Sequence, residues 1–154
     1  MVRWTARYEF PATLDWSYTF STEIGNNIWT IPFILTDTTT VIVFRTETRE
    51  FDVIEWPKPE GFPSYIWHCF SHNDQIYIWG AIGLHGDQML HRLNPQTLQN
   101  ELIISTGQQY YSSCVILGNM MYGLVENGKF SNNFNFAIIN LDRKEVVSSR
   151  FLVN

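Results

Sequence analysis

The chain has little charge, few cysteines and no long apolar run. Only 16% of its 154 residues are charged, and the formal net charge is −5, so no basic surface for nucleic acid or an anionic membrane is expected. Two cysteines are too few for a disulfide scaffold. No window approaches the roughly 20 apolar residues of a membrane-spanning helix, and the opening MVRWTARYEF lacks the apolar run of a secretory signal. These absences predict a cytoplasmic protein without nucleic-acid or membrane contacts.

Helical periodicity is also missing. No stretch of ten or more residues places apolar side chains at helical spacing behind a capping box. Aromatic residues, which favour strands, make up 16% of the chain, with 6 Trp, 7 Tyr and 11 Phe. Short apolar or alternating runs are separated by turn sequences such as SHND, NPQT and LDRK. The chain is therefore predicted to be all-β, with its first strands near residues 3–10 and 15–21.

The C-terminal half of the sequence is self-similar. The segment YIWHCFSHNDQIYIWG can be set against YSSCVILGNMMYGL further along the chain, at an offset of about 45 to 48 residues. This alignment matches Tyr65 with Tyr111, Cys69 with Cys114, Asn73 with Asn119, Tyr77 with Tyr122, and Leu93-Asn94-Pro95 with Leu141-Asp142-Arg143. Each unit reads as four strands in about 45 residues, which is the size of one β-propeller blade. A weaker copy begins near Asn27.

The predicted architecture is a single propeller-like domain of about three four-stranded antiparallel blades. Its units are a partial blade over residues 1–26, a degenerate blade over 27–63, and blades over 64–110 and 111–154. Closed propellers usually have four to eight blades, and an arc of three would leave sheet edges unpaired. The chain is therefore a fragment of a larger propeller, a partial propeller that closes by self-association, or a small sandwich or four-bladed ring.

The units over residues 65–154 resemble kelch repeats. IWHCFSHNDQIYIWGA supplies His68 and a second strand over residues 76–79, LNPQT supplies the turn that begins at Asn94, and Cys114 lies near the usual histidine of the next unit. Two features depart from the kelch pattern: the glycine pair is Gly80-Ala81 in one unit and missing in the other, and the tryptophan expected early in the fourth strand is absent from both. The resemblance implies a propeller with a binding surface on one face.

The His and Cys residues of the middle unit first suggest a metal or catalytic site. Alternation along a strand would put His68 and His72 on one face and Trp67 and Cys69 on the other. The two histidines would then be about 13 Å apart, too far to share one zinc ion. Cys69 and its repeat partner Cys114 are predicted to be core residues. No carboxylate pair, nucleophile elbow or phosphate loop appears, so no enzyme activity, cofactor or metal is predicted.

Four connections should form the binding face that the kelch resemblance implies: residues 60–64, 82–87, 107–111 and 127–133. From them, the predicted contact residues are Phe62, His85, Asp87, Tyr110, Lys129 and Phe130. The aromatic rings would act as anchors, and His85, Asp87 and Lys129 as orienting polar groups. His91 shares a strand face with Met89 and Leu93, which favours a core or sheet-face histidine.

The predicted function is a non-catalytic binding module for a protein partner, with self-association as a further contact. Two other classes stay open. A glycan-binding lectin would use the Trp and Tyr rings as stacking platforms. An enzyme on a propeller scaffold would need polar side chains, such as His68, converging on the central channel.

Overall fold

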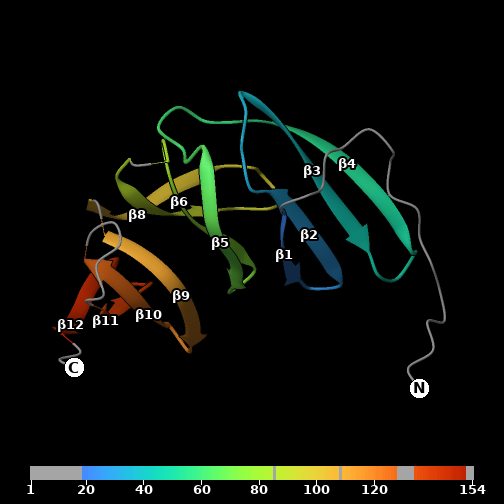
Figure 1. Ribbon diagram of the computed structural model, residues 1–154. Coiled ribbons are helices and arrows are strands. Elements are labelled where there is room, and N and C mark those ends of the chain that lie inside the picture. The colour runs from blue at the N-terminus through green and yellow to red at the C-terminus, as the bar shows by residue number, and fades with distance from the viewer. Residues whose placement is uncertain (1–18, 85, 108, 128–133, 152–154) are drawn as a thin grey trace, which may run out of the picture.

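The structure is a computed structural model that describes residues 19–84, 86–107, 109–127 and 134–151. These residues form three four-stranded antiparallel sheets (Figure 1), so the prediction of an all-β, propeller-like chain is confirmed. The first sheet contains β1 (Thr19–Ile24), β2 (Asn27–Pro32), β3 (Thr38–Arg45) and β4 (Glu50–Pro57); the middle sheet β5 (Tyr65–His72), β6 (Gln75–Ala81), β7 (Gln88–Leu93) and β8 (Asn100–Gly107); the last sheet β9 (Gln109–Leu117), β10 (Met120–Asn127), β11 (Phe134–Asn140) and β12 (Glu145–Phe151). None of the described segments is a helix long and apolar enough to cross a membrane.

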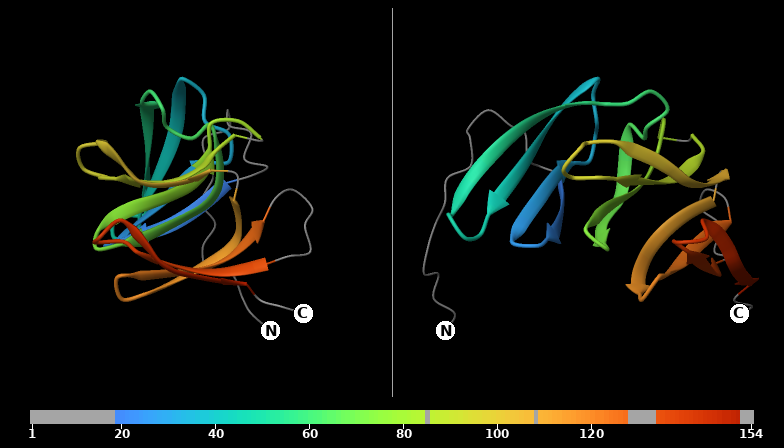
Figure 2. Two further views of the ribbon diagram at one scale, coloured as in Figure 1. Left: turned by 90° about the vertical axis from the view of Figure 1, so that its left-hand side faces the viewer. Right: turned by 180° about the vertical axis from the view of Figure 1, so that it is seen from behind.

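The sheets follow one another as the blades of a propeller do. In each sheet the strands pair in chain order, and the first strands lie side by side, β1 against β5 and β5 against β9. Figure 1 and Figure 2 show the first and the last sheet at opposite ends of an arc, with the middle sheet between them. The middle sheet is therefore covered on both faces, whereas each end sheet has one face without a neighbouring sheet among the described residues.

The start of the first blade differs from the prediction. β1 pairs with β2 from Thr19↔Pro32 to Ile24↔Asn27, so residues 19–24 belong to the same sheet as residues 27–57. The unit therefore begins no later than Thr19, and not at Asn27. The turn at Gly25, with a φ of 55°, joins the two strands and is the first tight turn of the sheet. The expected strand over residues 3–10 lies outside the described residues.

Strand register tests the internal repeat. Cys69 pairs with Ile78 and Cys114 pairs with Gly123, and both partners are the fourth residue of the second strand of their sheets. This confirms the match of Cys69 with Cys114. β5 and β9 also share an irregularity near their start, where the register with the second strand shifts by one residue.

Three of the aligned pairs are corrected by the strand pairing. His72 pairs with Gln75 and Leu117 pairs with Met120, so the turns between them are 73–74 and 118–119, and Asn119 matches Asp74 and not Asn73. Tyr65 lies opposite Ala81, the seventh residue of β6, and Tyr110 lies opposite Glu126, the seventh residue of β10. The counterpart of Tyr65 is therefore Tyr110, and not Tyr111.

The turns before the fourth strands shift the alignment as well. Asn94 Oδ1 accepts hydrogen bonds from the backbone N–H groups two and three residues on, at 2.9 and 3.2 Å, and Asn140 Oδ1 does the same at 3.1 and 2.9 Å. Asn94 therefore matches Asn140, and the predicted match with Asp142 is wrong by two residues. An asparagine side chain stabilises such a turn by replacing a backbone acceptor.

Two hydrophobic clusters hold the three sheets together. The cluster between the first and middle sheets contains Trp29, Ile31, Val41, Val43, Trp56, Ile66, Ile76, Ile78 and Leu93, with Phe62 from the connection after β4. The cluster between the middle and last sheets contains Tyr77, Trp79, Leu90, Met121, Ala137 and Ile139. Because β6 lies between both clusters, its sequence QIYIWGA is almost continuously apolar, and six of its seven residues are buried.

Candidate functional site

The loops at one end of the sheets are tied together by backbone hydrogen bonds. Leu35 N donates to Ser64 O at 2.8 Å, Ser64 N donates to Ala81 O at 2.9 Å, and Ile66 N donates to Phe33 O at 2.8 Å. These bonds join the β2–β3 loop, the β4–β5 connection and the end of β6 into one surface. We call it the loop face, comprising residues 33–37, 58–64, 82–84 and 86–87. It contains two of the four connections that were predicted to bind, residues 60–64 and the described part of 82–87.

Gly80 permits this close arrangement of the loops. A Cβ atom at this position would lie 2.2 Å from the carbonyl oxygen of Tyr65 and 2.8 Å from Cβ of Pro63. No side chain fits at those distances. The start of β5 and the connection before it can therefore approach β6 this closely only where β6 has a glycine. The first glycine of the Gly80-Ala81 pair therefore has a packing role at the loop face.

Three large aliphatic side chains are exposed on the loop face. Ile34 is 53% exposed, Ile82 55% and Leu84 50%. Ile34 forms a β-bridge with Tyr65, and Tyr65 pairs with Ala81, the residue before Ile82. Ile34 and Ile82 thus flank the start of β5 on its two sides, with Leu84 two residues further along. We call these three residues the apolar loop patch. Apolar side chains exposed together on loops commonly mark a binding surface.

An aromatic cluster lies beside the apolar loop patch. The ring of Phe33 packs edge-on against Tyr65 at a centroid distance of 6.0 Å and against Trp67 at 5.4 Å, while the Tyr65 and Trp67 rings are nearly parallel at 6.5 Å. All three residues are half-buried. Nε1 of Trp67 is buried and has no hydrogen-bond partner among the described residues. The cluster holds the start of β5 and the β2–β3 loop in fixed positions.

Phe62 does not occupy the position that the sequence analysis assigned to it. It is 1% exposed, and its ring packs edge-on against Trp56 at 4.9 Å and in a tilted arrangement against His91 at 4.7 Å. The ring therefore fills the core between the first and middle sheets, and in this arrangement it cannot contact a partner. The physical reason is the proline-rich connection, which folds back over the core instead of extending into solvent.

The other predicted contact residues are placed only in part. Asp87 is exposed on the loop face. Tyr110 belongs to β9, but its side chain is not described. His85, Lys129 and Phe130 lie outside the described residues. Three exposed residues of the loop face were not predicted: Ile34, Ile82 and Leu84. The apolar residues within PFILTDT and GAIGLHGD were a usable signal, because an aliphatic residue in a turn sequence has no strand face to bury it.

The histidine and cysteine residues of β5 do not alternate as expected. A register shift between Ile66 and His68 interrupts the strand. Trp67 and Phe70 therefore pack toward the last sheet, while Cys69 packs toward the first sheet. The prediction that Trp67 and Cys69 share a face is wrong for this reason. No group of three or more His, Cys, Asp or Glu side chains that could hold a metal ion occurs in the described parts of the chain.

Both cysteines are free and belong to the core, as predicted. Burial raises the pKa of Cys69 to about 12 and that of Cys114 to about 11. At neutral pH both are thiols, which are weak nucleophiles and weak metal ligands compared with thiolates.

His91 is a core histidine, as predicted. It is 4% exposed, its Nε2 lies 3.3 Å from the Met89 sulfur, and burial lowers its pKa.

Comparison with known proteins shows the fold. No family model matches the chain, and no curated protein matches its sequence. Among solved structures, the AtxE2 isopeptidase with astexin3-dC4 bound is similar, with a TM-score of 0.62 and 13% identity over 82% of this chain and 19% of that one. The Pyrococcus horikoshii acylaminoacyl peptidase has a TM-score of 0.53 and 11% identity over 87% of this chain and 25% of that one.

A third similar structure is the extracellular domain of a putative hybrid two-component system from B. thetaiotaomicron. It has a TM-score of 0.50 and 16% identity over 86% of this chain and 21% of that one. The chain thus spans between 19% and 25% of the length of these three proteins. At these identities the likeness establishes the arrangement of sheets and nothing about activity.

Proposed function

We propose that the chain is a non-catalytic binding module with kelch-like blades, and that its loop face binds an apolar segment of a protein partner. The observation that carries the proposal is the apolar loop patch, whose three side chains are each at least half exposed on adjoining loops. Single exposed aliphatic residues are ordinary, but three on adjoining loops offer an apolar partner several points of contact. Asp87, exposed three residues after Leu84, supplies a polar group on the same loop.

A rigid base supports the patch. The backbone bonds from Leu35 to Ser64 and from Ser64 to Ala81 fix the loops relative to the middle sheet, and Lys58 Nζ donates to Ser64 Oγ at 2.9 Å. Anchors held in place before binding lose little conformational entropy when the partner arrives. The repeated Asn94 and Asn140 turns and the close contact at Gly80 support the kelch-like assignment of the blades.

The chemistry of the patch favours a protein over a glycan. Sugars stack on exposed ring faces, whereas here the aliphatic side chains are exposed and the Phe33, Tyr65 and Trp67 rings are half-buried against one another. Aliphatic surface is the complement of an apolar peptide side chain, and its burial contributes about 25 cal/mol per Å².

A peptide selection tests the proposal. The chain would be screened against a displayed random-peptide library, and selected peptides measured against Leu84→Ser and, as a matched control, Leu102→Ser. Leu84 is 50% exposed on the loop face, and Leu102 is 51% exposed on β8. We expect peptides rich in apolar residues whose affinity falls roughly 5- to 30-fold with Leu84→Ser, as truncation of a contact anchor costs about 1–2 kcal/mol.

Leu102→Ser should leave the affinity unchanged. If the two variants weaken binding equally, or if no apolar peptide is selected, the loop face is not the binding surface. Binding on a glycan array that is lost in Trp67→Ala, with no peptide selected, would favour the lectin alternative.

A further inference from the structure

The outer face of the last sheet is apolar and has no sheet against it among the described residues. Leu117 is 72% exposed, Val115 63% and Phe136 37%. Together with Tyr122 and Leu124 they line a shallow hollow of about 500 Å³. We call these five residues the terminal face. None of them belongs to the loop face, so what covers the terminal face is independent of the proposed function.

The internal repeat shows what lies against the same position in the other two blades. Trp29, Tyr77 and Tyr122 are each the third residue of the second strand of their sheets. Trp29 is 6% exposed and Tyr77 is 2% exposed, because each packs in the cluster shared with the sheet that follows in the chain. Tyr122 occupies the same position but is half-buried. A four-stranded sheet therefore covers this position in both earlier blades.

The third strand gives the same result. Leu90 lies opposite Trp79, the fifth residue of β6, and Phe136 lies opposite Leu124, the fifth residue of β10. Leu90 is fully buried in the cluster between the middle and last sheets, whereas its counterpart Phe136 is 37% exposed. Two positions on different strands thus indicate that the complement of the terminal face is the apolar face of another sheet.

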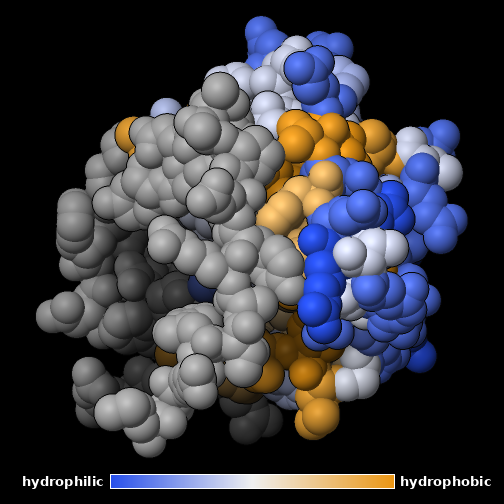
Figure 3. Space-filling model, turned by 90° about the vertical axis from the view of Figure 1, so that its right-hand side faces the viewer, coloured by the Kyte–Doolittle hydropathy of each residue, from blue (hydrophilic) through white to orange (hydrophobic). Residues whose placement is uncertain are grey.

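The outer face of the first sheet does not offer that complement. It is already buried at its centre, where Ile42 is 1% exposed and Thr30 is 9% exposed. Glu23 and Glu55 lie exposed on the same face. Figure 3 views this end of the molecule, where polar side chains border the apolar ones on the described surface. Packing this face on the terminal face would bring two carboxylates against apolar side chains, which is costly.

The terminal face is uncharged and more exposed. On β9, β10 and β11 the described side chains of the outer face carry no charge, and Met120 and Ile138 continue its apolar surface. Ten large apolar side chains are more than one third exposed in the described residues; five belong to the strands of the last sheet and only Val53 to those of the first. Within the described chain, the sheet face that best matches the terminal face is therefore the terminal face itself.

We propose that a second copy of this chain covers the terminal face with its own terminal face. A two-fold axis relates the two copies, so the same side chains meet from both sides and the contact closes at a dimer. Two sheets that pack face to face lie about 10 Å apart, with the side chains of their inner faces interdigitating. Leu117, the most exposed residue of the terminal face, then enters the hollow of the opposite copy.

The size of the sheet sets the expected strength of the dimer. Four strands about 4.8 Å apart, rising about 3.3 Å per residue over seven residues, make a face of roughly 19 by 23 Å. Two such faces bury roughly 900 Å², which is the size of a transient contact. We therefore expect monomer and dimer to be in equilibrium at micromolar concentrations.

Sedimentation equilibrium measures the predicted dimer directly. Over about 1–300 µM the mass of the wild-type chain should rise from one chain toward two. Val115→Lys with Leu117→Lys puts lysines on both sides of the contact and should weaken the dimer at least about tenfold. Both positions are more than half exposed in the single chain, so the variant should fold, which circular dichroism checks. Val53→Lys, at a position 51% exposed on the first sheet, is the control and should leave the dimer unchanged.

A mixture of two variants separates this arrangement from others. Val115→Glu with Leu117→Glu should also dimerise weakly alone, but more tightly when mixed with the lysine variant, because lysine meets glutamate only where two terminal faces meet. A mixture no tighter than its components overturns the proposal, since the terminal face then contacts a different surface. A wild type that stays monomeric over the whole concentration range overturns it as well. A Val53→Lys variant weakened as much as the terminal-face variants would place the first sheet in the contact and contradict the proposed arrangement.

Discussion

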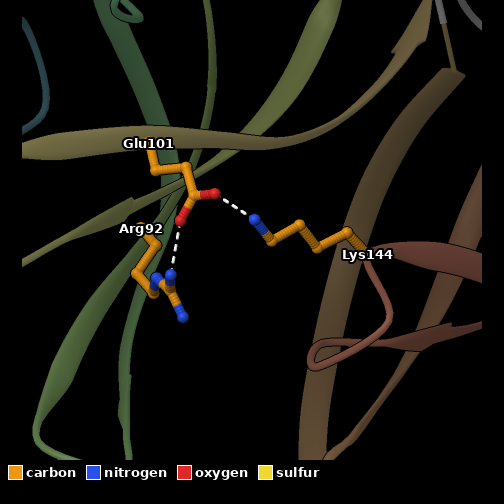
Figure 4. A network of polar contacts seen from close by, with 3 residues as sticks. All are labelled: Arg92, Glu101 and Lys144. Carbon is orange, nitrogen blue, oxygen red and sulfur yellow. Dashed lines mark hydrogen bonds and ion pairs between the residues drawn. The ribbon is translucent and has the colours of Figure 1, made fainter.

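Lys144 of the last sheet forms an ion pair with Glu101 of the middle sheet, and Glu101 also pairs with Arg92 on the neighbouring strand (Figure 4). Lys144 stands in the turn between β11 and β12 with a φ of 56°, and from there its side chain extends across the boundary between the two sheets. The hydrogen bond from Lys144 is the main cause that lowers the pKa of Glu101, with a further contribution from Arg92. The three side chains thus supplement the apolar cluster between these sheets.

Lys144→Ala should lower the free energy of unfolding by about 0.2–1 kcal/mol at pH 7, since all three side chains are more than one third exposed. The pKa of Glu101 is lower in the folded state, so its contribution is present above the unfolded value near 4.5 and is lost as the pH falls through the folded value. Denaturant unfolding of wild type and variant at pH 7 and at a pH well below the unfolded pKa of Glu101 measures the difference in the free energy of unfolding.

Arg143→Ala is the matched control for Lys144→Ala. Within the part of the chain that the structure describes, the Arg143 side chain pairs with Glu145, the first residue of β12, at 3.6 Å, and it is 75% exposed. Its removal should therefore change stability less. A Lys144→Ala effect of equal size at acidic and neutral pH would show that the loss comes from packing and not from the ion pair.

The glycine at the loop face gives a second prediction. Gly80→Ala should destabilise the chain by roughly 1–3 kcal/mol or more, because the new Cβ would meet the Tyr65 carbonyl oxygen at 2.2 Å and backbone must move. Gly83→Ala is the control, since nothing lies within 4 Å of a Cβ built there. Urea unfolding of both variants tests the difference. Equal stabilities would mean that the β4–β5 connection does not pass as close to β6 as the structure places it.

The buried thiols predict a loss of stability in alkali. Their pKa values are raised in the folded state, to about 12 for Cys69 and about 11 for Cys114. Each raised pKa contributes to the free energy of unfolding. The contribution is complete below the unfolded pKa near 9 and is lost as the pH rises above it. At pH 10 the loss should be on the order of 1–2 kcal/mol per thiol. Cys69→Ala should therefore lose less stability than wild type between pH 7.5 and pH 10. Parallel curves for the two proteins would contradict the burial of Cys69.

Thiol modification gives an independent measurement. In the native state both cysteines should react with an alkylating reagent far more slowly than a free thiol, because the thiolate is the reactive form. Adding denaturant should restore the ordinary rate.

Regular spacing made the blades predictable from the sequence. The match of Cys69 with Cys114 survived because strand residues far from the turns keep the offset of 45, as the register shows. The errors fell toward the ends of the strands. The extra residue near the start of β5 is also present in β9, so the offset stays at 45 and Tyr65 matches Tyr110. Between the second and third strands the offset rises by one residue, so Asn94 matches Asn140. A single extra residue reverses the face of every side chain beyond it, and sequence spacing does not reveal such an insertion.

The candidate site was harder to predict because burial depends on the path of a connection. Phe62 in a proline-rich segment resembled an exposed anchor, yet it is 1% exposed. Ile82 and Leu84 resembled minor members of a glycine-rich loop, yet they are among the most exposed aliphatic residues described. Contacts between segments far apart in the chain decide both outcomes, and these contacts have no periodic signal in the sequence.

The contact between Phe62 and His91 leads to the last prediction. Burial lowers the pKa of His91, so the unfolded chain binds a proton near pH 6.5 more readily than the folded chain does. Stability is therefore complete above pH 6.5 and falls as the pH drops below it, by at most about 1.4 kcal/mol at pH 5.5. His91→Gln removes the titrating group but keeps a polar side chain, and should lose less stability than wild type between pH 7.5 and pH 5.5 in denaturant unfolding. If wild type and His91→Gln lose the same amount, the imidazole is protonated in the folded chain, and Phe62 then packs against a cation.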